Sequence, residues 1–200
     1  MKFSKSTVWT FVILVLTASL YRVWSQRPFG FAPQVAMAIF GGAVIKDKKL
    51  ALVLPLLSML ISDALYQILY TYDLSPIKGY YRGQWANYLL FAVITVFGMQ
   101  MKKINFKNVL GFSLGGTAIF FLLSNFGVWI GQGGYQRPRT FDGLLQCYWD
   151  AITFYRDYGV VKGFYGNQLI GDLFFSFVLF GAYYLINKFA IAKQTVPATN

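Results

Sequence analysis

The sequence predicts an all-α membrane protein: a six-transmembrane-helix bundle with an amphipathic helix in the outer loop between the fifth and sixth spans. Three observations support this fold class. Of the 200 residues, 56% are hydrophobic and 20% aromatic, and only 12% are charged. Soluble domains carry about 25% charged residues, and a soluble fold of this size cannot hide so much apolar surface. Short lysine-containing stretches separate the apolar runs, a pattern typical of multi-pass membrane proteins.

The apolar runs define six candidate spans. They cover residues 8–24, 31–45, 50–72, 84–101, 108–131 and 168–189. We expect one transmembrane domain over residues 1–193 and a polar tail over 194–200. The first run follows two lysines and resembles a signal peptide, but the later spans favour an uncleaved first helix. The second run is short, since residues 31–45 reach only about 22 Å at 1.5 Å per residue.

The basic residues predict the orientation of the spans. If all six runs cross the bilayer, ten lysines share one side: Lys2, Lys5, Lys46, Lys48, Lys49, Lys102, Lys103, Lys107, Lys188 and Lys193. The positive-inside rule makes that side cytoplasmic, so both termini are expected inside. Every arginine falls on the other side, where its planar fork suits carboxylates or phosphates.

The long outer segment, residues 132–167, contains a predicted amphipathic helix over 141–157. Thr140 is placed to cap it, and Asp142 in its first turn suits the helix dipole. Its apolar positions are Phe141, Leu144, Leu145, Tyr148, Ile152 and Tyr155, and its polar positions are Asp142, Gln146, Asp150 and Asp157. Such a helix either covers a pocket or anchors the loop at the membrane surface, and the sequence leaves both open.

Composition also excludes several classes of function. The net charge of +11 comes from lysines between spans, which encodes topology rather than nucleic-acid binding. The chain has no His or Glu and one cysteine, Cys147, so we expect no metal site, no cofactor and no enzymatic activity. Asp172 follows Gly171, but Leu169 and the Ser62–Asp63 pair depart from the intramembrane aspartyl protease pattern. We expect Cys147 to be a small buried apolar residue.

Two carboxylates within apolar spans, Asp63 and Asp172, are the leading candidate site residues. A charge at mid-bilayer costs about 2.5–3.5 kcal/mol, so such residues face the bundle interior with a partner or a task. The predicted topology places Gln34 and Asn125 in the same outer half. A pocket open to the outside would then be lined by these four residues, with Arg27 and Trp129 nearby. The alternative is a hydrogen-bond network that only holds the helices together.

Three segments carry a resemblance to known families. They read RPFGFAPQVAMAIFGGAVIKDKKLALVLPLLSMLISDALYQ, NFGVWIGQGGY and LIGDLFFSFVLFGAYY, within residues 27–185. The chain resembles a bacterial family of six-helix membrane proteins whose function is not established. It is more distantly similar to the substrate-binding (S) components of energy-coupling-factor vitamin transporters. That similarity implies an outward-facing pocket, and a partner subunit docked on small residues such as Ala38 and Gly42, although no vitamin-specific motif is visible.

The sequence therefore supports two functional hypotheses. The first is a solute-binding or transport component of the bacterial cytoplasmic membrane, whose outer arginines attract an anionic or zwitterionic solute. The second is a non-catalytic scaffold or assembly subunit of a larger membrane complex. A shared polar site between Asp63 and Asp172 is expected under the first. If Arg27 reaches inward, it should pair with one of these aspartates.

Overall fold

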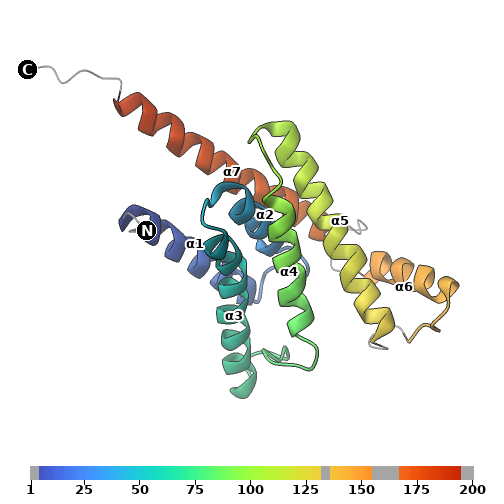
Figure 1. Ribbon diagram of the computed structural model, residues 1–200. Helices are drawn as coiled ribbons and strands as arrows, with labels where there is room; N and C mark the ends of the chain where they lie inside the picture. The colour runs from blue at the N-terminus through green and yellow to red at the C-terminus, as the bar shows by residue number, and fades with distance from the viewer. Residues whose placement is uncertain (1–4, 132–135, 155–166, 195–200) are drawn as a thin grey trace, which may run out of the picture.

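The computed structural model describes residues 5–131, 136–154 and 167–194, and all regular secondary structure within these ranges is α-helical (Figure 1). The helices are α1 (Lys5–Val23), α2 (Gln34–Val44), α3 (Lys48–Thr71), α4 (Trp85–Gly98), α5 (Phe106–Ile130), α6 (Phe141–Phe154) and α7 (Asn167–Gln194). Each predicted span coincides with one helix to within a few residues at each end. The predicted loop helix is α6; residues 155–157 of that prediction lie outside the described ranges.

Several of these helices have the length and composition of a membrane span. Lys48–Thr71, Phe106–Ile130 and residues Asn167–Lys188 of α7 are long and apolar enough to cross a bilayer. The apolar stretches Trp9–Val23, Gln34–Val44 and Trp85–Gly98 are shorter. The structure thus supports a helical membrane protein, while the count of six spans remains a prediction.

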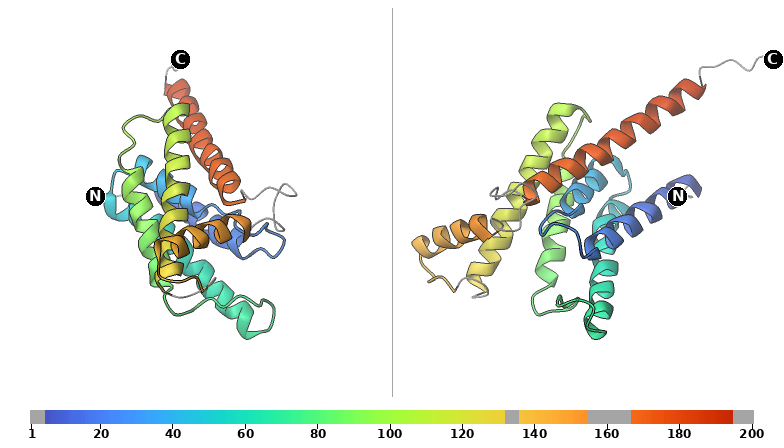
Figure 2. Two further views of the ribbon diagram at one scale, coloured as in Figure 1. Left: turned by 90° about the vertical axis from the view of Figure 1, so that its right-hand side faces the viewer. Right: turned by 180° about the vertical axis from the view of Figure 1, so that it is seen from behind.

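The short helix α2 lies at the centre of the bundle. It contacts α3, α4, α5 and α7, and every residue from Gln34 to Gly42 is buried (Figures 1 and 2). On its α7 side, the rings of Phe40 and Phe180 meet with centroids 5.2 Å apart. Because other helices surround α2, it can be shorter than the hydrocarbon core without exposing backbone polar groups to lipid.

Two adjacent glycines let α2 approach its neighbours closely. A Cβ added at Gly42 would lie 2.2 Å from the carbonyl oxygen of Thr95 on α4. A Cβ added at Gly41 would lie 3.0 Å from the carbonyl oxygen of Ala51 on α3. Pro55, inside α3, has no N–H to donate to that Ala51 carbonyl, so the helix leaves it free where Gly41 packs.

This packing corrects the expected role of Ala38 and Gly42. Ala38 is fully buried, and Gly42 faces the backbone of α4 inside the same chain. Small residues at these positions therefore serve contacts within the bundle and present no surface to another protein. Gly111 and Gly127, in similar small-residue spacings on α5, have no described atom within 4 Å of an added Cβ.

The outer elements are arranged around this centre. Seen from both sides, the first half of α1 and the last half of α7 extend beyond the bundle in the same direction (Figures 1 and 2). Helix α6 packs on α5, and as predicted, the Thr140 hydroxyl accepts a hydrogen bond from the Gly143 N–H at its start. Cys147 is buried in that contact, as expected from the sequence.

Candidate functional site

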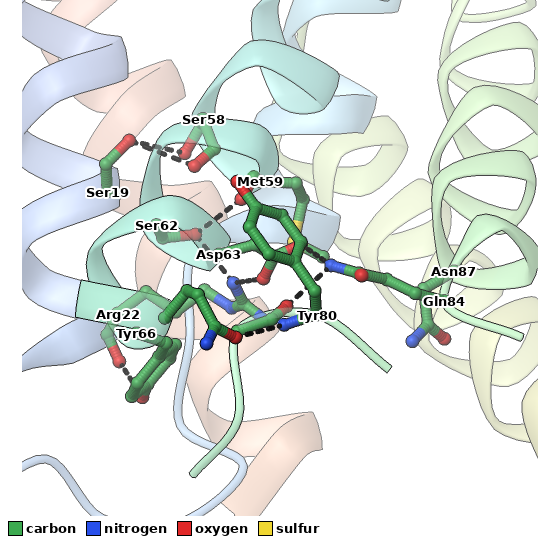
Figure 3. A network of polar contacts seen from close by, with 12 residues as sticks. Ser19, Arg22, Ser58, Met59, Ser62, Asp63, Tyr66, Tyr80, Gln84 and Asn87 are labelled. Atoms are coloured by element: carbon green, nitrogen blue, oxygen red, sulfur yellow. Dashed lines mark hydrogen bonds and ion pairs between the residues drawn. The ribbon is translucent and has the colours of Figure 1, made fainter. Parts of the chain in front are cut away.

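The carboxylate of Asp63 is the centre of a polar network (Figure 3). Asp63 lies in α3 and only 2% of its surface is exposed. One oxygen pairs with the guanidinium of Arg22, near the end of α1. The other accepts hydrogen bonds from the Gln84 amide, just before α4, and from the Tyr88 hydroxyl at 2.6 Å. Both oxygens are therefore satisfied by donors from other parts of the chain.

Arg22 is fixed by more than its ion pair. Its guanidinium also donates to the Ser62 hydroxyl at 2.6 Å and lies 5.5 Å from the centroid of the Tyr66 ring. The Tyr66 hydroxyl donates to the Arg22 carbonyl at 2.5 Å, which satisfies one of the free carbonyls in the last turn of α1. One turn earlier on α1, the Ser19 hydroxyl oxygen lies 3.0 Å from the Ser58 carbonyl oxygen of α3 and 2.7 Å from the Val15 carbonyl oxygen of its own helix. This hydrogen bonding joins α1 and α3 along matching faces.

The loop between α3 and α4 brings Gln84 to the carboxylate. Gly79 lies against the backbone of α3, so that an added Cβ would be 1.9 Å from the Asp63 carbonyl oxygen. The Gln84 amide nitrogen also donates to the Gly79 carbonyl at 2.9 Å. The Tyr80 N–H donates to the Gln67 side chain at 3.2 Å. The absence of a side chain at Gly79 thus allows the loop to deliver Gln84.

We expect Gly79→Ala to lower the free energy of unfolding by about 1–3 kcal/mol, because the added methyl group overlaps the α3 backbone. The displaced loop should also withdraw Gln84 from Asp63. Gly111→Ala is the matched control, since its Cβ meets open space. Thermal unfolding in detergent compares the two variants, and equal midpoints would contradict the close approach of the loop.

Asp172 has much sparser surroundings than Asp63. It lies on α7 with 1% of its surface exposed, and it is hydrogen-bonded to the Thr117 hydroxyl of α5 at 2.7 Å. Among the described residues, no Lys or Arg side chain forms an ion pair with it. Asp172 is therefore a buried carboxyl group without a compensating cation in the part of the chain that the structure describes.

A polar stripe on α7 extends from Asp172 in both directions. Gln168 and Ser176 lie one turn before and one turn after it, so the three residues share a helix face. The Ser176 hydroxyl is buried and has no hydrogen-bond partner, and the buried Gln168 amide nitrogen lies beside the Asp172 carboxyl group without a close hydrogen bond. Sequence reasoning missed Gln168, Ser176 and Thr117, although the four-residue spacing along α7 was a usable signal.

Gln34, another predicted site residue, is also buried without partners. Its surface is 3% exposed, and neither its amide nitrogen nor its carbonyl oxygen makes a hydrogen bond. Gln34, Ala38 and Gly41 lie on one face of α2, and Gly41 packs on α3. Gln34 therefore lies on the α3 side of the central helix.

The remaining predicted residues have other partners. Arg27 donates to the backbone carbonyls of Arg22 and Phe31, at 3.1 and 3.2 Å, and to that of Pro28 at 3.4 Å. The predicted pairing of Arg27 with an aspartate is wrong: Arg22 pairs with Asp63, because α1 continues as a helix to Val23 and turns Arg22 toward α3.

Asn125 and Trp129 lie where α5 meets α6. The side-chain amide of Asn125 donates to the Phe121 backbone carbonyl at 2.8 Å. The backbone carbonyl of Asn125 accepts a hydrogen bond from the Cys147 thiol at 3.7 Å. The Trp129 indole donates to the Pro138 carbonyl at 2.9 Å. None of these described hydrogen bonds includes either aspartate.

The loop helix is held by a charged pair and by small residues. Gly143, Cys147 and Ala151 are its buried positions, whereas Leu145 and Ile152 are exposed. Arg137 pairs with Asp150 at 2.6 Å, and this hydrogen bond holds the pKa of the Asp150 carboxyl below its usual value. The helix therefore docks through small side chains and through Tyr148, whose hydroxyl donates to the Leu122 carbonyl of α5 at 3.0 Å, and it leaves Leu145 and Ile152 outward.

The predicted shared site divides into two in the structure. The described hydrogen bonds of Asp63 reach α1, the α3–α4 loop and α4, and those of Asp172 reach α5. The two carboxylates have no hydrogen-bond partner in common among the described residues. No group of three His, Cys, Asp or Glu side chains suited to a metal ion occurs within the described ranges.

Comparison with known proteins gives one match. No curated protein and no solved structure matches the chain. A family model matches residues 2–196, nearly the whole sequence. The chain therefore belongs to DUF6580, a family of unknown function.

Proposed function

We propose that this protein is a solute-binding component of the bacterial cytoplasmic membrane, with its binding site on the polar stripe of α7. The observation that carries the proposal is the buried Ser176 hydroxyl, which has no hydrogen-bond partner and shares a helix face with the buried Asp172. A buried polar group without a hydrogen bond costs about 1–3 kcal/mol, and lipid offers no donor or acceptor. A bound polar solute would supply the missing partners.

The distribution of satisfied and unsatisfied groups supports this choice over Asp63. Asp63 has an ion pair and two further donors, so its network is complete without a ligand. Asp172 has the Thr117 hydroxyl and no cation among the described residues. Buried polar groups without hydrogen-bond partners are rare in native structures, and a bound polar solute would account for them here.

Six spans with both termini in the cytoplasm belong to the same proposal. Six apolar helices lie at the predicted positions, and lysines occupy the short connections after α2 and α4. In this topology, α7 runs inward, so Asp172 lies about one turn below the outer surface of the membrane. The site would then be reached from outside the cell.

The alternative is a scaffold or assembly subunit, and the closed Asp63 network favours it specifically. That network joins α1, α3, α4 and the loop between α3 and α4, as expected of a polar cluster that holds helices together. The distant similarity to S components is part of the solute-binding proposal and does not bear on the scaffold alternative. Because Ala38 and Gly42 are covered, a partner subunit would need to dock on a different face.

Binding can be tested on purified protein in detergent. Small molecules that elute with the protein are identified and then added back during thermal unfolding. At a concentration 100 times its Kd, a solute should stabilise the folded protein by about 2.7 kcal/mol. Asp172→Asn should abolish this stabilisation. Asp142→Asn, at an exposed carboxylate of α6, should retain it. Stabilisation that survives Asp172→Asn would contradict the site, and a partner protein eluting in place of any solute would favour the scaffold.

A further inference from the structure

The hydrogen bonds of Thr117 can accommodate a protonated Asp172. The Thr117 hydroxyl oxygen lies 2.7 Å from an Asp172 carboxyl oxygen and 3.0 Å from the Ser113 carbonyl oxygen. A hydroxyl has one proton, so it cannot donate fully to both oxygens. If Asp172 is protonated, its O–H donates to Thr117, and the Thr117 O–H donates to the Ser113 carbonyl. The protonated acid satisfies both contacts. With a carboxylate, Thr117 donates to Asp172 instead, and the Ser113 carbonyl keeps the backbone N–H of its own helix.

Among the residues that the structure describes, charged and titratable groups are sparse around Asp172. Helix α2 contains none, and on α5 the one such residue is Lys107, about 15 Å along the helix from Thr117. On α7, Tyr183, Tyr184, Lys188 and Lys193 lie three or more turns away in sequence. On α1, the ring of Tyr21 meets that of Phe175, three residues after Asp172, with centroids 5.2 Å apart. In the segment that touches Gly171, Arg27 donates to backbone carbonyls.

We propose that Asp172 exchanges its proton for the ammonium group of an amine-bearing solute, which deepens and rests on the proposed function. In the empty site the group is a neutral carboxylic acid. When a solute R–NH3+ enters, the acid O–H bond breaks, the proton leaves to external water, and the carboxylate pairs with the ammonium. Charge balances, because one cation enters as one proton departs. The site stays neutral in both states, which avoids an isolated buried charge.

The flanking groups fit such a solute. In the ionised state, Thr117 can turn its proton from Ser113 to the carboxylate, and the Gln168 amide can donate to the carboxylate or to the solute. The Ser176 hydroxyl, one turn deeper, can accept from the ammonium. A zwitterionic solute also carries an ammonium group, so it can make the same contacts as a simple amine.

Infrared difference spectroscopy on the ligand-free protein tests the protonated state directly. The wild type should show a carbonyl band of a protonated carboxylic acid that disappears in Asp172→Asn and is unchanged in Asp142→Asn. Thr117→Val should shift this band without removing it. This second variant assigns the band to Asp172 even if Asp172→Asn fails to fold. A ligand-free wild type without the band would overturn the proposal.

Adding ethylammonium tests the exchange, with ethanol as a neutral molecule of the same size. Ethylammonium should remove the band and release one proton per amine bound into weakly buffered solution, and ethanol should do neither. A band that persists at saturating ethylammonium would overturn the exchange. If the acid band is present but no solute stabilises the protein, the proposed function is rejected and the protonated state stands. If a solute binds but the ligand-free protein lacks the band, the exchange is rejected and the proposed function stands.

Discussion

Replacing Arg22 by Met should cost about 3–5 kcal/mol of stability, because it leaves the buried Asp63 carboxylate without its cation. Asp63 is 2% exposed, and its other donors, Gln84 and Tyr88, are neutral amide and hydroxyl groups. Methionine keeps the length and apolar stem of the side chain, so the loss reports the charge and its hydrogen bonds. Reversible unfolding in mixed micelles measures the difference.

Two further variants separate this effect from a general loss of contacts. Arg137→Met breaks an exposed ion pair with Asp150 and should change stability little, because solvent screens such pairs. Arg22→Met combined with Asp63→Asn removes both charges and should recover part of the loss. If Arg22→Met were no more damaging than Arg137→Met, the buried ion pair would not hold α1 on α3.

Gly42→Ala should destabilise the bundle by about 1–3 kcal/mol or more, because the added methyl group has no space between α2 and α4. Its Cβ would lie 2.2 Å from the Thr95 carbonyl oxygen and 2.8 Å from the Met99 nitrogen. Both atoms are backbone, so relief requires that one helix move.

The control for Gly42 is again a helical glycine in open space. At Gly111→Ala, where an added Cβ meets nothing within 4 Å, alanine should stabilise the helix by about 0.5–1 kcal/mol. The two substitutions make the same chemical change and are expected to act in opposite directions. Chemical unfolding of both variants in the same detergent measures this, and equal effects would contradict the close packing of α2 on α4.

Much of the fold could be predicted from the sequence, because apolar length determines where helices form. The first and last residues of the helices were less predictable, since they depend on particular side chains. Asp47 accepts hydrogen bonds from the N–H groups of Lys49 and Leu50, and Asn105 accepts one from Asn108. These caps start α3 and α5 two residues before the apolar runs predicted.

The site was less predictable, because pairing depends on how helices rotate against one another. Placing Asp63 and Asp172 inside the bundle followed from desolvation alone. Choosing Arg22 over Arg27 required matching Ser19 and Arg22 on α1 to Ser58 and Ser62 on α3. Topology ranked residues by depth, which is why Asn125 was grouped with the aspartates although it contacts α6.

The position of α2 also has a consequence for biogenesis. This helix is synthesised well before α7, yet α7 covers one of its sides through Phe40 and Phe180. Chains fold from the N-terminus as they are made, so α2 must wait in the insertion machinery or in lipid until α7 has been made. A chain truncated before α7 would leave this side of α2 uncovered, and cellular proteases could recognise the defect.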